Sequence, residues 1–179
     1  MQQPSRFTKW FGPLAEIEIR RADPSEYDAI AKLTVTAYDV LEEDHSAAHQ
    51  EYLVMLADVA GRAAQADVIV AVGTDGTVLG STTLVLDTDS EMAEWDEDGT
   101  AGFRMLAVAM HAQGKGVGRK LTEHCIDAAR AANKTAVLIH SRDIMQAARH
   151  IYSGYGFVRH PEIDFEVEGI KLDGFRLAL

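Results

Sequence analysis

Residues 107–121 read AVAMHAQGKGVGRKL. An apolar, strand-like run ends here, and glycines follow at alternate positions, Gly114, Gly116 and Gly118. The segment 111–120 carries lysine and arginine but no acidic residue, although the formal net charge of the chain is -11. A strand that leads through a glycine-rich turn into a helix can bind an anion, because free backbone N–H groups and the positive end of the helix dipole converge there. The pattern therefore predicts a phosphate-binding turn.

Two well-known phosphate-binding patterns do not fit this turn. A Walker A motif requires glycine at position 109 and serine or threonine directly after Lys115, whereas the chain has Ala109 and Gly116 there. The dinucleotide pattern G-x-G-x-x-G fails as well, because its last position does not fall on a glycine. The pattern that remains is Q-x-x-G-x-G at 113–118. The alternative interpretation is a plain glycine turn with surface cations beside it.

The hydrophobic periodicity predicts an α/β (α+β) fold with the element order βααβββαβαββ. Apolar runs predict strands at 17–22, 68–73, 77–86, 101–109, 135–141, 163–168 and 172–178. Helices are predicted over 24–38, 46–65, 116–132 and 143–153. The Asp75-Gly76 pair between two apolar runs predicts a β-hairpin. We expect a mixed, mostly antiparallel central sheet with helices on both faces, in a single domain at 16–179 after a flexible leader at 1–15.

The composition is that of an ordinary soluble globular protein and excludes several classes. With 179 residues, of which 47% are hydrophobic and 25% charged, the chain can form one domain with a sizeable core. No apolar run approaches the roughly 18–20 residues that span a bilayer, and we find no secretory signal pattern. The acidic balance argues against a nucleic-acid partner, because phosphate binding needs a basic face. The single cysteine, Cys125, is expected in the core and excludes internal disulfides, which favours a cytoplasmic protein. From these features together we expect no membrane and no nucleic-acid partner.

Two motifs in the second half of the chain carry a resemblance to a known family. Leu106-Ala107-Val108 precedes 113–118, and residues 148–157 read ARHIYSGYGF. In form and spacing they resemble the two signatures of the GNAT superfamily of acetyl-CoA-dependent N-acetyltransferases, l-x-V before Q/R-x-x-G-x-G/A, and A-x-x-l-Y-x-x-x-G-F. The predicted element order is similar to the fold of that family. The resemblance implies a GNAT-type N-acetyltransferase, an acyltransferase that uses acetyl-CoA as its acyl-donor substrate.

The resemblance also implies which residues contact acetyl-CoA. The N–H groups of residues 114–119 would hold its pyrophosphate, with charge from Lys115, Arg119 and Lys120 nearby. The backbone of residues 106–108 would pair with the pantetheine arm like an additional strand, which requires an open sheet edge. The cofactor-binding residues implied in this way are Leu106, Ala107, Val108, Gln113, Gly114, Lys115, Gly116, Val117, Gly118 and Arg119.

Direct attack of an amine on the thioester requires two proton transfers. An alkylammonium with a pKa near 10.4 is deprotonated only about once in 2,500 at pH 7, so a base or a water relay must remove its proton. The leaving thiolate, with an aqueous pKa near 8.5, needs a proton donor. The resemblance implies that Tyr152 is this general acid, and the alternative is a tyrosine that packs under the sheet. Periodicity places Tyr152 beside the core stripe of its helix, which comprises Ile144, Ala148, Ile151 and Tyr155.

The general base is not evident from the motifs. The glutamate that many family members carry would fall on Gly102 or Arg104, and neither residue can be a base. A water chain remains a candidate, as do the acidic residues Glu94, Asp96, Glu97, Asp98, Glu162 and Asp164. A family asparagine corresponds to Met145, so any polar contact from that side chain is lost.

The acceptor is not specified by the sequence, although the net charge favours a small cationic amine. Residues 87–98 contain seven acids and no cation. We interpret them as a solvated loop, with an acidic wall that attracts the amine as the alternative. Three rivals to acetyl transfer remain: use of another acyl-CoA, a non-catalytic acetyl-CoA sensor, and an interaction protein without a cofactor. A free sheet edge at the C-terminus would suit a homodimer.

Two histidine-containing groups are interpreted as structural. His45 and His49 have an i, i+4 spacing that can hold a metal ion, but no third ligand is evident, so we predict no metal site. His140, Ser141 and Asp143 contain the residue types of a hydrolase triad. Neighbours in a strand point to opposite faces, so His140 is not expected to serve Ser141. Ser141 or Asp143 is instead expected to cap the following helix.

Overall fold

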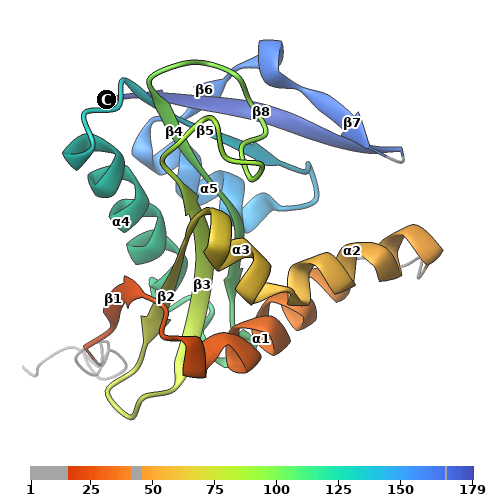
Figure 1. Cartoon of the computed structure of the whole chain (residues 1–179), viewed down its shortest axis with the longest axis vertical. Coiled ribbons are helices and arrows are strands. Elements are labelled where there is room, and N and C mark those ends of the chain that lie inside the picture. Colours follow the sequence, from red (N-terminus) through yellow and green to blue (C-terminus); the bar gives the residue numbers. More distant parts are fainter. Residues whose placement is uncertain (1–15, 42–45, 168) are drawn as a thin grey trace, which may run out of the picture.

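One mixed sheet with helices on both faces forms the body of the protein (Figure 1). The computed structural model describes residues 16–41, 46–167 and 169–179. The strands are β1 (Glu18–Arg21), β2 (Asp67–Val72), β3 (Val78–Val85), β4 (Thr100–Val108), β5 (Ala136–Ser141), β6 (Val158–Arg159), β7 (Phe165–Val167) and β8 (Ile170–Ala178). The helices are α1 (Tyr27–Asp39), α2 (Ala47–Ala57), α3 (Val59–Gln65), α4 (Val117–Ala131) and α5 (Gln146–Tyr155), with short 3-10 helices η1 (Pro24–Glu26), η2 (Met110–Ala112) and η3 (Pro161–Ile163).

The strand order is β1-β2-β3-β4-β5-β8-β6, and β7 pairs with β8 beside that path. In the part of the chain that the structure describes, β4 and β5 are the one parallel pair. The predicted fold class is therefore confirmed. The C-terminal strand β8 is not a free edge, because β5 lies on one side of it and β6 and β7 on the other. The leader predicted at 1–15 lies outside the described residues.

Local sequence signals account for the hairpin and for one departure from the prediction. Gly76 has φ +81° and the side chain of Asp75 accepts a hydrogen bond from the Thr77 N–H, so the predicted β2–β3 hairpin is confirmed. The helix predicted over 46–65 is divided into α2 and α3. Asp58 causes the break, because its backbone leaves the helical region and its side chain accepts from the Gly61 N–H to cap α3.

The start of α5 corrects another prediction. This helix begins at Gln146, later than predicted, and its N-cap residue Met145 makes no side-chain cap. The expected cap from Ser141 or Asp143 is therefore wrong. The Ser141 hydroxyl instead donates to the carbonyl of Arg142, at 3.3 Å.

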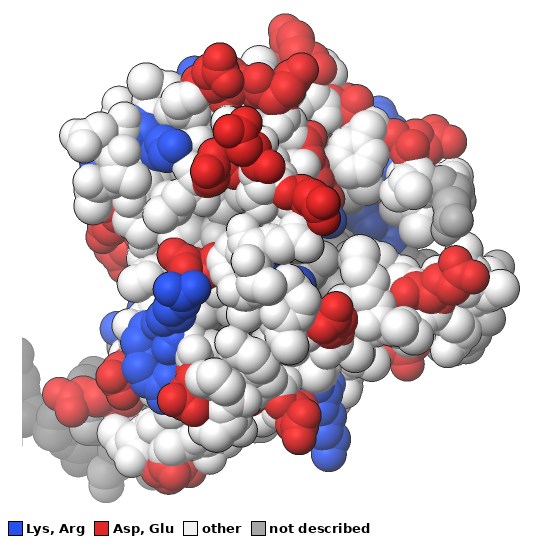
Figure 2. All heavy atoms as spheres, viewed as in Figure 1, with Lys and Arg blue, Asp and Glu red and all other residues white. Residues whose placement is uncertain are grey.

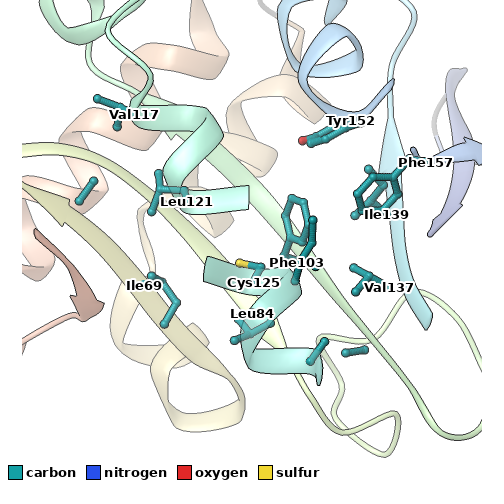
Figure 3. Close-up of a cluster of buried hydrophobic side chains, with 14 of the residues drawn as sticks. Ile69, Leu84, Phe103, Val117, Leu121, Cys125, Val137, Ile139, Tyr152 and Phe157 are labelled. Atoms are coloured by element: carbon teal, nitrogen blue, oxygen red, sulfur yellow. The ribbon is translucent and has the colours of Figure 1, made fainter. Parts of the chain in front are cut away.

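Strand β2 shows how the two faces of the sheet are filled. Val68 and Val70 pack with Ile30 of α1 on one face. Ile69 and Ala71 point to the opposite face and join the cluster formed with α4 and α5 (Figure 3). This period-two alternation buries both faces of the strand, as the predicted two helical layers require.

Helix α4 presents a continuous apolar stripe to the sheet. Its buried apolar side chains are Val117, Leu121, Cys125, Ile126 and Ala129. Burial raises the pKa of the Cys125 thiol, so the thiol stays protonated. This is the small core cysteine that the sequence predicts.

The acidic segment 87–98 is a loop whose acidic side chains are mostly exposed, as interpreted, but it also packs against the sheet through Trp95. Trp95 is 8% exposed and belongs to a cluster with Val85 of β3 and Leu138 of β5. A Cβ atom at Gly102 of β4 would overlap the Trp95 ring and the Leu138 carbonyl. Glycine at position 102 therefore leaves the space that the indole occupies.

We predict that Gly102→Ala lowers the free energy of unfolding by about 2–3 kcal/mol, because the added methyl group must displace Trp95 or β5. Urea unfolding followed by tryptophan fluorescence measures this loss. Gly154→Ala in α5 is the matched control, since a Cβ atom there would meet no atom closer than 3.8 Å. The control should be neutral or slightly stabilising. Equal stability of both variants would contradict this account of Gly102.

Candidate functional site

Strands β4 and β5 separate along their length. They pair in parallel only over Thr100–Gly102 and Ala136–Leu138 in the described structure. Beyond these residues, β4 continues in register with β3, and β5 continues in register with β8. The sheet therefore opens between the two strands, and this opening is the centre of the candidate site.

A β-bulge sets the direction of the C-terminal half of β4. Arg104 lies opposite Thr83 and Ala107 opposite Ser81, so two residues of β4 face Thr82 alone. Met105, the first of these two, has φ +55°. The bulge changes the direction of β4 at the point where it leaves β5.

The backbone groups of Leu106 and Val108 face the opening. The Ala109 N–H donates to the Leu79 carbonyl at 2.9 Å, and the Ala107 carbonyl also lies on the β3 side, close to Gly80. Backbone groups alternate in direction along a strand, so those of Leu106 and Val108 point away from β3. The structure thus gives residues 106–108 the open edge that the sequence prediction requires.

The turn before α4 presents a row of free backbone donors. In the described chain, no N–H group of residues 114–119 donates to an acceptor, and the Lys120 N–H makes the first bond, to the Gly116 carbonyl. Gly114 and Gly116 have φ +71° and +81°, and a Cβ atom on either would meet nothing within 4 Å. The amides therefore face open space at the positive end of the helix dipole.

The remaining residues of the turn have different surroundings. Lys115 and Gln113 are exposed, and the Gln113 side chain donates to the Val108 carbonyl at 3.4 Å. Arg119 stacks on the Tyr155 ring at 5.6 Å. Their side chains therefore lie on the surface around the free amides.

Val117 and Gly118 are buried, so only their backbone groups could contact a ligand. A Cβ atom at Gly118 would lie 3.1 Å from Ile151, so this glycine allows α4 to approach α5 closely. The ten cofactor-binding residues predicted from the motifs thus gather where β4 ends and α4 begins.

Tyr152 is the buried residue of α5, which corrects the prediction that it lies beside the core stripe. Its ring is 5.8 Å from Phe103 and 5.7 Å from Phe157, and its oxygen points away from Phe157 (Figure 3). The hydroxyl has no hydrogen-bond partner among the described residues, yet it is not fully enclosed. Burial raises the pKa of Tyr152, with a smaller effect from Cys125. The side chain is therefore a protonated phenol with a free donor.

A carboxylate from the acidic segment bridges the two separating strands. Glu94 forms an ion pair with Arg104 of β4 through one oxygen, and the other oxygen lies 3.0 Å from Nδ1 of His140 on β5. Arg104 and His140 each stand two residues beyond the last β4–β5 pair. Glu94 thus replaces, with side-chain contacts, the backbone pairing that the opening removes.

The hydrogen bonds of His140 define its proton positions. Nε2 lies 2.7 Å from the Ile163 carbonyl, which can only accept, so Nε2 carries a proton. The other ring nitrogen, Nδ1, faces Glu94. The imidazole is 2% exposed and is held between the Ile163 carbonyl and the Glu94 carboxyl group. The sequence offered no sign of this bridge, because Glu94 and His140 are 46 residues apart.

The other acidic candidates for a general base are paired or exposed. Glu97 contacts Arg176 at 3.0 Å, and Asp164 contacts Arg159 at 2.8 Å. The Arg159 hydrogen bond lowers the pKa of Asp164 to about 2. A cleft of about 640 Å³ lies between the acidic segment and η3 and β7, lined by Ala93, Glu94, Trp95, Asp96, Glu162, Ile163, Asp164 and Phe165. The acidic segment thus forms one wall of a cleft beside the opening.

The structure also shows the surroundings of the histidine-containing groups that are interpreted as structural from the sequence. His45 lies outside the described residues, and His49 contacts Asp39 at 2.9 Å. Residues 16–41, 46–167 and 169–179 contain no group of three or more potential metal ligands, and no helix in these ranges is long and apolar enough to cross a membrane. Ser141 makes no hydrogen bond with His140 in the described chain.

The fold, with its opened sheet edge beside a row of free amides, is that of the acetyltransferase class of α/β proteins. Residues 28–157 match the acetyltransferase (GNAT) family, and the chain belongs to this family. A comparison with curated proteins gives no match.

Solved structures share the fold at low sequence identity. A GNAT-family acetyltransferase from Staphylococcus aureus has a TM-score of 0.69 at 13% identity, covering 92% of this chain and 99% of its own. A GCN5-related N-acetyltransferase from Kribbella flavida has a TM-score of 0.65 at 23% identity, and the match covers 94% of this chain and 100% of that protein's chain. A Brucella melitensis GNAT-family acetyltransferase, in complex with acetyl-CoA, has a TM-score of 0.62 at 22% identity, and the match covers 92% of this chain and 89% of that protein's chain.

We predict that Glu94→Gln lowers the free energy of unfolding by about 2–4 kcal/mol, because the variant leaves Arg104 and His140 without their shared anion in a partly buried site. Urea unfolding at neutral pH measures the loss. Glu91→Gln is the control, since Glu91 is exposed in the same segment and makes no ion pair in the described structure. A Glu94→Gln variant as stable as this control would contradict the bridging role.

Proposed function

We propose that this protein transfers the acetyl group of acetyl-CoA directly to a primary amine. The observation that carries the proposal is the row of free amides at 114–119, placed at the end of the open β4 edge. An anion and an extended chain can bind side by side there. The pyrophosphate and the pantetheine arm of acetyl-CoA have this combination of groups.

The proposed binding mode uses the backbone more than the side chains. The amides of Gly114 to Arg119 hold the pyrophosphate, and the exposed cations Lys115 and Arg119 add charge. The pantetheine amides pair with the backbone of Leu106 and Val108 as an additional strand. This mode places the thioester within the opening, towards Tyr152 and the Glu94 bridge.

Tyr152 is proposed as the general acid. The amine nitrogen attacks the thioester carbonyl carbon, and the carbon–sulfur bond of the tetrahedral intermediate then breaks. The thiolate takes the phenol proton of Tyr152, and the phenolate takes up the proton that the nitrogen loses after its attack. The earlier proton, which the ammonium ion loses before the attack, leaves to solvent. The raised pKa of Tyr152 keeps the donor protonated at neutral pH. Its hydroxyl has no competing acceptor in the described chain.

Removal of the amine proton is assigned to water. Ionisation equilibria make this step cost about 4–5 kcal/mol at pH 7. Glu94 is close to the opening, but one of its oxygens already contacts Arg104 and the other contacts His140. A water chain through the cleft lined by Glu162 and Asp96 can carry the proton to solvent. Acidic side chains on this face of the molecule favour an acceptor whose amine arrives protonated (Figure 2).

A non-catalytic acetyl-CoA sensor is the second candidate. Arg104 occupies a position where the family resemblance places a glutamate, and this favours the sensor. Retention of Tyr152 favours the enzyme. Turnover with any amine separates the two. A cytoplasmic location and a homodimer remain predictions.

We predict that Gly116→Val weakens acetyl-CoA binding by roughly 10–100-fold, because the side chain fills the space in front of the amides and the bond to the anion is lost. Isothermal titration calorimetry measures the Kd. Gly76→Val is the matched control, since Gly76 also has φ +81° and open space around it but lies in the β2–β3 turn. Equal affinity in both variants would contradict the assignment of the site.

We predict that Tyr152→Phe lowers kcat about 100-fold, because the thiolate loses its proton donor, while the Kd of acetyl-CoA stays within twofold. Steady-state rates with thiol detection and calorimetry measure the two quantities. Tyr27→Phe is the control, since Tyr27 is half-buried and packs against the apolar cluster that contains Ile30, Val68 and Val70. Unchanged turnover of Tyr152→Phe would show that another group donates the proton.

A further inference from the structure

Arg62 of α3 is a buried cation without an anionic partner in the described structure. The residue is 3% exposed. Its guanidinium donates to the Thr83 hydroxyl at 2.9 Å and to the Leu56 carbonyl at 3.0 Å, and both acceptors are neutral. Burial lowers the pKa of Arg62, which reflects the cost of a charge removed from water. An unpaired buried charge of this kind indicates a missing counter-ion.

A second guanidinium lies close to the first. Arg104 is in register with Thr83, the residue that Arg62 contacts, and the positive charge of Arg104 also lowers the pKa of Arg62. Arg104 donates to the Met92 carbonyl and pairs with Glu94. Among the described residues, Glu94 is the only carboxylate that forms an ion pair with either arginine. Asp58, the N-cap residue of α3, raises the pKa of Arg62 without forming an ion pair with it, so the two guanidiniums have one ion-paired carboxylate between them. This excess of positive charge occurs inside a chain whose net charge is -11.

Each arginine also keeps one unused donor. The Nε atoms of Arg62 and Arg104 are buried and have no hydrogen-bond acceptor. Buried donors without acceptors are rare in folded proteins. The Nη atoms of both guanidiniums already have acceptors or an ion pair, so Nε is the free donor of each residue. The two orphan donors therefore point to an anionic group that the protein itself does not provide.

The two arginines lie beside the opening between β4 and β5. Arg104 directly precedes the bulge at Met105, where β4 leaves β5. The rings of Tyr38 and Tyr52 form an edge-on pair at 6.0 Å nearby. Burial raises the pKa of Tyr52 to about 12, and Arg104 lowers it to a smaller extent. Glu94, the ion-pair partner of Arg104, lines the cleft between the acidic segment and β7.

We infer that the acceptor is a small amine that also carries an acid group, such as an α-amino acid, and that Arg62 and Arg104 bind this acid group. The inference rests on the proposed acetyl transfer and specifies its substrate class. The anion supplies the missing counter-charge and accepts from the orphan donors. The amine of the same molecule then lies at the opening, beside the thioester.

The competing explanation is that Arg62 is only a structural tie. In that case it joins the end of α2 to β3 through the Leu56 carbonyl and Thr83, and no substrate group contacts it. This explanation predicts loss of stability in Arg62 variants but no effect on the choice between acceptors. The two explanations therefore differ in substrate preference.

The test compares matched acceptors that differ by one carboxylate. L-Phenylalanine and phenethylamine form one pair, and L-leucine and isoamylamine form another. We expect kcat/KM with the wild-type enzyme to be about 100-fold higher for the amino acid of at least one pair. Equal or faster acetylation of the simple amine in every pair would overturn the inference and leave acetyl transfer standing. Absence of acetyl-CoA binding would overturn both proposals.

Variants of Arg62 test whether this residue causes the preference for the amino acid over the simple amine. In Arg62→Gln we expect the ratio of the two kcat/KM values to fall at least about tenfold, because the charge and the free Nε donor are lost. Arg62→Lys, which keeps the charge, serves if Arg62→Gln does not fold and should lower the ratio less. Arg130→Gln is the control, since Arg130 is exposed on α4 and pairs only with Asp127 in the described chain. An unchanged ratio in a folded Arg62 variant would show that Arg62 is only a structural tie.

Discussion

The separation of β4 from β5 after three paired residues is the constraint on which the rest of the structure depends. A sheet that stayed paired would use the backbone groups of Leu106 and Val108 in its own ladder, and no open edge would remain. The bulge at Met105 turns β4 away, and α4 then begins beside the free edge. An open strand edge and a helix N-terminus thus meet in one place, which suits a ligand with an extended arm and a charged end.

An opening inside a sheet has a cost, because neighbouring strands lose their hydrogen bonds. The acidic segment compensates for part of this loss. Trp95 covers the last paired residues from one face, in the space that Gly102 leaves. Glu94 then links Arg104 to His140 across the gap. The segment that is richest in negative charge is therefore also the one that fastens the two strands at the opening.

The local charge at two places near the site is positive, whereas the net charge of the chain is negative. The protein is acidic overall, yet one group of cations lies at the start of α4 and a second, Arg62 and Arg104, lies beside the opening. The first group meets solvent and the second is buried, so they differ in physical effect. Exposed cations attract an anion but bind it weakly because water screens them. Buried guanidiniums without enough carboxylates hold an anion strongly, since a low dielectric strengthens the pairing.

The sequence by itself determined the order of helices and strands along the chain in outline, the hairpin at Asp75-Gly76 and the glycine turn before α4, because these depend on residues that are neighbours in the chain. Only the tertiary structure decided the burial of Tyr152, the packing of the acidic segment and the pairing of Arg62 with Thr83. Their partners lie 21 to 46 residues away or on other elements, and no local periodicity encodes such distances. Local patterns specify backbone geometry, whereas the environment of a charge or a phenol arises only when distant segments pack together.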